Sequence, residues 1–190
     1  MDVPTESFHR VEGWLRLLAD KGIKSLIIRF RGELDYPIVP IDVFSAGSAV
    51  TTLELVRYRV PPLPSTFGGL PKLTSLHLND LHFPEHGERM LEVLISRSPL
   101  LEKLLIALMM IGNPNGGGHL KWVIWAPKLK ALHMMSWIDL GWQAEEFPSL
   151  ETAQIIIYGP QMARILPSLS QAKKLFHLLG KLLYLHQNFS

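Results

Sequence analysis

Leucines alternate with polar residues in a short phrase that recurs along the chain. The run SLHLN at residues 75–79 would place its two leucines on one side of an extended segment and its three polar residues on the other. A proline opens each copy, and Pro71, Pro99, Pro127 and Pro148 lie 28, 28 and 21 residues apart. A recurring interval of this size predicts a solenoid built from stacked units.

Aligning the first buried position of each copy predicts six equivalent strands. These positions are Leu26, Leu53, Leu76, Leu104, Leu132 and Ala153, at intervals of 27, 23, 28, 28 and 21 residues. We expect residues 8–160 to form an α/β leucine-rich-repeat solenoid of about six irregular units. Its parallel β-sheet would line the concave side, with helices or irregular segments on the convex side.

Two stretches have the periodicity of an amphipathic helix. The first, residues 8–20, spaces its apolar residues by three or four positions, at Phe8, Val11, Trp14, Leu15 and Leu18. Gly22 can end this helix in a left-handed conformation, and a strand is expected over residues 23–30. The second helix is expected over residues 86–96, because Pro99 prevents its continuation.

The remaining segments are assigned from their turn residues and helix breakers. Residues 31–47 predict a connection with little regular structure, residues 50–60 a strand, and residues 119–125 a short extended segment on the convex side. Residues 161–190 are helix-compatible over 162–185. We expect them to form either a helical cap on the last repeat or a truncated further repeat.

Composition narrows the class of protein. The chain has 190 residues, 47% of them hydrophobic and 19% charged, with a formal net charge of +2 and no cysteine. This balance favours a folded domain and gives no reason to expect nucleic acid or a membrane as partner. No signal peptide is apparent and the longest apolar run, residues 104–111, is too short to span a bilayer, so an intracellular protein of cytoplasm or nucleus is expected.

Candidate chemistry is sparse, and we expect neither an enzyme nor a cofactor. The motif Gly-x-Ser-x-Gly is absent, and the glycines at 116–118 lack the lysine and Ser/Thr of a phosphate loop. His77 and His133 are equivalent positions two repeats apart, about 10 Å, which is too far for a shared metal. His82 and His86 are expected to lie in a solvated turn.

The concave face is the expected binding surface. We predict that a protein partner contacts Arg29, Glu54, His77, Asn79, Leu105, Ala107, His133, Met135, Gln154 and Ile156. Four of these positions form an apolar group on successive strands: Leu105, Ala107, Met135 and Ile156. Such a group is either an interface or is covered by the C-terminal segment of the chain.

Four tryptophans are concentrated in one region, at Trp122, Trp125, Trp137 and Trp142. They would fill the core of the convex side or, alternatively, form a cage for a small molecule.

Longer runs resemble plant F-box/leucine-rich-repeat proteins, particularly the large cereal group. The resemblance covers about residues 10–160. Its runs are WLRLL at 14–18, GIKSL at 22–26, LPSTFGGLPKLTSLHLND at 63–80, LEVLISRSPLLEKL at 91–104 and WAPKLKAL at 125–132.

The resemblance implies a protein-binding role. In that family an F-box docks on the Skp-type adaptor of a cullin–RING ubiquitin ligase, and the repeats select the substrate. The F-box would precede residue 10 and is not recognisable in this chain. The resemblance therefore implies the substrate-recognition part of an SCF-type F-box protein. The alternatives are an F-box-less interaction or decoy protein without a ligase role, or a small-molecule receptor at the tryptophan-rich region.

Overall fold

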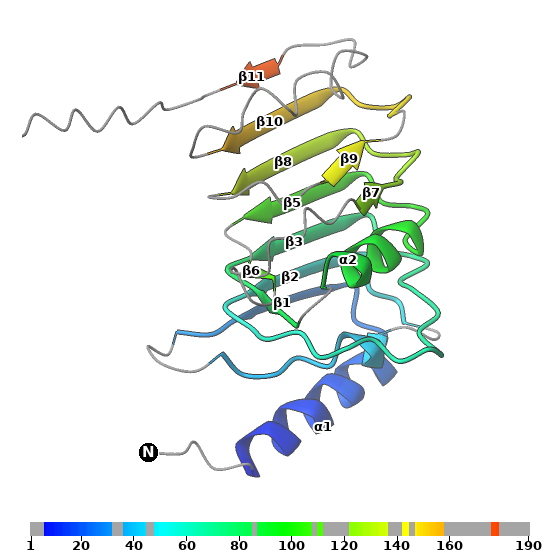
Figure 1. Cartoon of the computed structure of the whole chain (residues 1–190). Coiled ribbons are helices and arrows are strands. Elements are labelled where there is room, and N and C mark those ends of the chain that lie inside the picture. Colours follow the sequence, from blue (N-terminus) through cyan, green and yellow to red (C-terminus); the bar gives the residue numbers. More distant parts are fainter. Residues whose placement is uncertain are drawn as a thin grey trace, which may run out of the picture.

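A single parallel sheet organises the chain (Figure 1). The computed structural model describes residues 6–31, 36–44, 48–84, 87–107, 110–111, 122–136, 142–144, 147–157 and 176–178. The sheet has seven strands in the order β1-β2-β3-β5-β8-β10-β11. Their bounds are β1 (Ser25–Arg29), β2 (Thr52–Val56), β3 (Ser75–Asn79), β5 (Lys103–Ala107), β8 (Ala131–Ser136), β10 (Thr152–Ile157) and β11 (Phe176–Leu178). The predicted α/β solenoid with one parallel sheet is confirmed.

The strand register pairs the residues that the sequence predicts to be equivalent in successive repeats. Leu26 pairs with Leu53, Leu53 with Leu76, and Leu76 with Leu104. Leu104 then pairs with Leu132, and Leu132 with Ala153. Every unit therefore enters the sheet in the same register, although the connecting segments differ in length.

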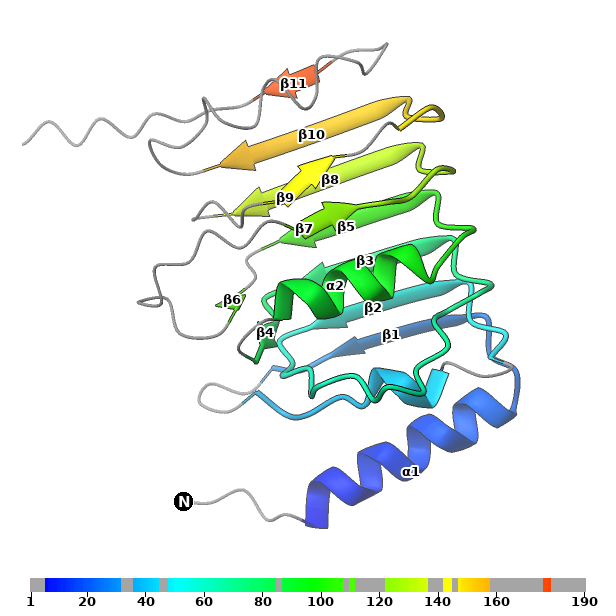
Figure 2. The same cartoon turned by 45° about the vertical axis from the view of Figure 1, so that its right-hand side comes forward.

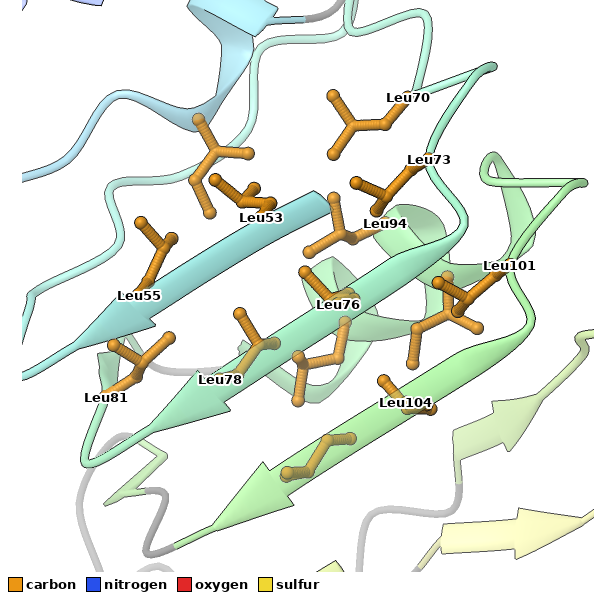
Figure 3. Close-up of a cluster of buried hydrophobic side chains, with 14 of the residues drawn as sticks. Leu53, Leu55, Leu70, Leu73, Leu76, Leu78, Leu81, Leu94, Leu101 and Leu104 are labelled. Carbon is orange, nitrogen blue, oxygen red and sulfur yellow. The ribbon is translucent and has the colours of Figure 1, made fainter. Parts of the chain in front are cut away.

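The core lies on one side of this sheet, because alternate residues of each strand point the same way. Figure 3 shows the leucines of β2, β3 and β5 directed toward the side that holds the second helix, α2 (Gly87–Ser96). Turn residues and helix residues fill the space between the strand leucines. The labelled members of this cluster are Leu53, Leu55, Leu70, Leu73, Leu76, Leu78, Leu81, Leu94, Leu101 and Leu104, and all are buried.

The alternation shifts by one residue after β2 and after β3. Arg57 (φ 64°) and Asp80 (φ 52°) occupy equivalent left-handed positions there. Past each of them the chain runs extended again and forms a second parallel ladder, in which the Val60 amide donates to the His82 carbonyl at 2.8 Å. The buried side chains of this ladder are Tyr58, Val60, Leu81 and Phe83. The strand predicted over residues 50–60 is therefore interrupted at Arg57, because a left-handed residue turns the backbone out of the sheet.

The ladder continues in two short strands, β4 (His82–Phe83) and β6 (Met110–Ile111), which pair in parallel. A second small sheet pairs β7 (Trp122–Ile124) with β9 (Trp142–Ala144). Helix α2, β7 and β9 lie on the same side of the main sheet (Figure 2). This confirms the helix predicted over residues 86–96, and the extended convex segment within 119–125.

Helix α1 (Glu6–Asp20) lies beyond the edge strand β1, at the N-terminal end of the sheet (Figure 1). Leu15 is buried as predicted, but Trp14 is 67% exposed, so it does not belong to the buried stripe. The connection over residues 31–47, expected to have little regular structure, contains the short 3-10 helix η1 (Ile41–Phe44), which buries Ile41 and Phe44 against the core. Neither of the described helices is long and apolar enough to cross a membrane.

For the C-terminal segment, residues 161–190, the sequence predicts either a helical cap or a truncated further repeat. Within it, residues 176–178 form β11, which pairs with β10 and places Phe176 opposite Ala153. This pairing extends the sheet by one strand, as a further repeat would. The rest of 161–190 lies outside the described residues.

Candidate functional site

The concave face is the side of the main sheet opposite the leucine core and α2. Its side chains stand in three rows, because register pairs equivalent residues of neighbouring strands. The inner row is Ile27, Glu54, His77, Leu105, His133 and Gln154. The second row is Arg29, Val56, Asn79, Ala107, Met135 and Ile156, and the third is Ser25, Thr52, Ser75, Lys103, Ala131 and Thr152. All ten predicted site residues thus share one face, and their role in binding stays a prediction.

The half of this face nearest β1 carries an internally paired polar cluster beside two apolar side chains, Ile27, which is 54% exposed, and Val56, which is half-buried. The Arg29 guanidinium donates from Nε to Glu54 Oε1 at 2.7 Å. The other carboxylate oxygen of Glu54 lies 3.5 Å from His77 Nδ1. Because the Glu54 side chain is only 14% exposed and already neutralised by Arg29, this carboxylate offers little to a partner.

The other half carries a group of apolar side chains among polar ones. Leu105, Met135 and Ile156 are half-buried and form what we call the apolar patch. Ala107 was expected to join them, but it is only 3% exposed, since its methyl group lies between the longer side chains of Asn79 and Met135 on adjacent strands. The contact surface on this half therefore comes from three side chains rather than four.

Two histidines flank Leu105, one on each neighbouring strand. Burial lowers the pKa of His133, and the nearby charge of His77 lowers it further. His133 is therefore neutral at neutral pH. Among the described residues no three metal-ligating side chains come together, so these histidines form no metal centre there.

The lowered pKa of His133 makes stability depend on pH. The unfolded chain takes up a proton on this residue near its ordinary pKa of about 6.5, before the folded chain does. The contribution of neutral His133 is fully present above about pH 6.5 and is lost as the pH falls through the lower pKa of the folded state. Urea unfolding should show that His133→Gln loses less stability than the original chain between about pH 7 and about pH 5. Equal losses would contradict this account.

A polar network at the carboxyl edge of the sheet was not anticipated. The Tyr36 hydroxyl donates to Asp80 Oδ1 at 2.8 Å, while Arg57 Nε lies 3.4 Å from Asp80 Oδ2. The Arg57 guanidinium carbon is 5.6 Å from the Tyr36 ring centroid. The centroid of the His82 ring lies 4.0 Å from that of Tyr36. Burial and then the hydrogen bond to Asp80 raise the pKa of Tyr36, which keeps the hydroxyl protonated.

This network pairs its own charges, so we assign it to holding residues 36–39 against the sheet edge. The prediction of a solvated turn is wrong for His82, which lies in β4 and packs against the tilted ring of Tyr36. His86 lies outside the described residues. The sequence carried one signal of the network, namely the three-residue steps from Leu55 to Tyr58 and from Leu78 to Leu81.

The tryptophan-rich region is only partly described. Trp125 is 44% exposed, so core filling is wrong for this residue. Strands β7 and β9 pair Trp122 with Trp142, and Trp137 lies outside the described residues. The alternative of a small-molecule site in this region stays a prediction.

The comparisons with known proteins agree with this geometry. A family model described as the LRR repeats of the FBD-associated F-box protein At5g56370 matches residues 11–182. The chain is 28% identical over 109 residues to the F-box/LRR-repeat protein At3g59190 of Arabidopsis thaliana, a match covering 53% of this chain and 26% of that protein. It is 24% identical over 151 residues to the F-box/LRR-repeat protein At4g14103 of the same plant, covering 77% of this chain and 36% of that protein. The chain thus spans well under half the length of either relative, and no solved structure is significantly similar to it.

Proposed function

The chain belongs to the leucine-rich-repeat region of plant F-box/LRR-repeat proteins, and we propose on this basis that its concave face recognises the protein substrate of an SCF-type ubiquitin ligase. Repeats of this family act in general as protein-interaction modules and not as catalysts. The proposal assigns the partner to the concave face and places the protein in the cytoplasm or nucleus.

The observation that carries this proposal is the apolar patch. Leu105, Met135 and Ile156 expose part of their surface on the face opposite the core, on three neighbouring strands. Helix α2, β7 and β9 cover the other face (Figure 2). A small apolar centre bordered by polar side chains is the usual composition of a protein-binding surface.

The double variant Leu105→Glu/Met135→Glu should lose its partner. Two carboxylates in the centre of an apolar contact would have to be desolvated on binding, and a central contact of this kind is worth at least about 2 kcal/mol, or about thirtyfold in affinity. The measurement is affinity capture from plant extract followed by mass spectrometry, with the affinity for each captured protein then measured by titration.

The matched control is Trp14→Glu/Leu17→Glu. It introduces two carboxylates at apolar positions of α1 that are 67% and 56% exposed, away from the concave face. Circular dichroism and thermal unfolding of both variants establish that each is folded. If a folded Leu105→Glu/Met135→Glu variant captures the same proteins with the same affinity, the concave face is not the binding surface.

The same capture separates the ligase role from the decoy role. Recovery of a Skp-type adaptor and a cullin with the chain supports assembly into the ligase. Recovery of patch-dependent proteins without adaptor or cullin supports an interaction or decoy module. If the chain recovers the adaptor, the double variant should recover it too, because adaptor docking would not involve the concave face.

A further inference from the structure

Leu105 is surrounded by groups that can recognise a carboxylate. His77 and His133 lie on the neighbouring strands, about 4.8 Å away along the row. Lys103 precedes Leu105 by two residues on β5, so both side chains point to the concave face, about 6.6 Å apart along the strand. The apolar patch therefore has one ammonium group and two imidazoles at its border.

The charges of the concave face are unequally distributed. Arg29, Glu54 and Lys103 are its only permanently charged residues on the six strands β1 to β10 of the main sheet. Glu54 is engaged by Arg29 at 2.7 Å, whereas Lys103 is exposed and forms no ion pair with any described residue. A basic partner would meet an uncompensated like charge beside the patch, and an acidic one would meet an available counter-charge.

We propose that the recognised segment carries an aspartate or glutamate next to an apolar side chain. The apolar side chain rests on Leu105 and Met135, and the carboxylate is held by Lys103, with the imidazole N–H group of His133 as a further donor. In an extended segment, side chains two residues apart are separated by about 6.6 Å, which matches the step from Leu105 to Lys103. This inference rests on the proposed function, since it needs the concave face to be the binding surface.

The probe for this proposal is a displayed library of random peptides. Peptides are selected on the full chain, and those that also bind Leu105→Gln are discarded, which leaves the peptides that require the patch. This neutral substitution removes the apolar side chain without itself repelling acidic peptides. We expect these to be enriched in Asp or Glu within about two residues of Leu, Ile, Met or Phe.

Charge reversal then tests the role of Lys103. Lys103→Glu should lower the affinity for these peptides about tenfold, because an exposed attraction between opposite charges becomes a repulsion of similar strength. Exchanging the acid of the peptide for lysine should restore affinity for Lys103→Glu. The matched control is Lys72→Glu, which reverses an exposed charge in the turn before β3 and should change affinity little.

The outcomes separate the two proposals. Patch-dependent peptides without enrichment in acid, or with unchanged affinity for a folded Lys103→Glu variant, overturn the acidic-segment proposal and leave the proposed function in place. A selection in which no peptide depends on Leu105, combined with unchanged partner capture by Leu105→Glu/Met135→Glu, overturns both.

Discussion

Replacing Leu76 with alanine is expected to lower the free energy of unfolding by about 2–5 kcal/mol. The Leu76 side chain is only 1% exposed and lies in the core between Leu53 and Leu104 of the adjacent strands. Removing three buried carbon atoms sacrifices their transfer free energy and leaves a cavity that the surrounding strands can close only partly. Urea or guanidinium unfolding, followed by circular dichroism, measures the change.

The control for this substitution is Ser75→Ala on the same strand. Ser75 points to the concave face and is half-buried, so its replacement should change stability by less than about 0.5 kcal/mol. A loss of similar size in both variants would show that the strand responds to any substitution and that leucine burial is not the cause.

Replacing Gly69 with alanine is expected to cost about 2–4 kcal/mol. Gly69 has a φ of +87°, a left-handed conformation that residues with a Cβ adopt at a cost of about 1–2 kcal/mol. An added Cβ would also overlap the backbone carbonyl of Arg97 just beyond α2. That carbonyl accepts from the Leu70 amide at 3.1 Å, and the Arg97 guanidinium donates to the Phe67 carbonyl. Moving Arg97 away from residue 69 would therefore break these hydrogen bonds.

Gly68 provides the comparison. A Cβ at this neighbouring residue would meet nothing within 4 Å and its φ is not left-handed. Gly68→Ala should therefore leave the thermal midpoint nearly unchanged, while Gly69→Ala lowers it. Similar midpoints for the two variants would contradict the close approach of residue 69 to the end of α2.

The sheet could be predicted because its determinants are local. Leu76 and Leu78 alternate with polar residues, and that pattern sets which side of the strand is buried regardless of what surrounds it. The second ladder could not be predicted in the same way. A left-handed backbone is uncommon for residues other than glycine, although aspartate is enriched in it, and Arg57 and Asp80 adopt it where their amides donate to the next unit, at the carbonyls of Asn79 and Ala107.

Burial of individual side chains also depended on neighbours distant in sequence. Trp14 suits an apolar helix stripe, yet the described contacts of α1 bury Leu15 and leave Trp14 in solvent. On the concave face, alternation correctly placed the rows. Alternation could not reveal that Ala107 would lie buried between the longer residues paired with it on β3 and β8. Nor could it reveal that Arg29 would donate a hydrogen bond to Glu54.

The parallel stacking has a mechanical consequence. Neighbouring strands are joined by backbone hydrogen bonds that run along the axis of the stack, from β1 toward β11. A force that pulls the two ends of the stack apart would load every interface between strands in series, so each one bears the full tension. The interface with the weakest adhesion would yield first, and a tethered chain of this kind would extend in steps of one unit.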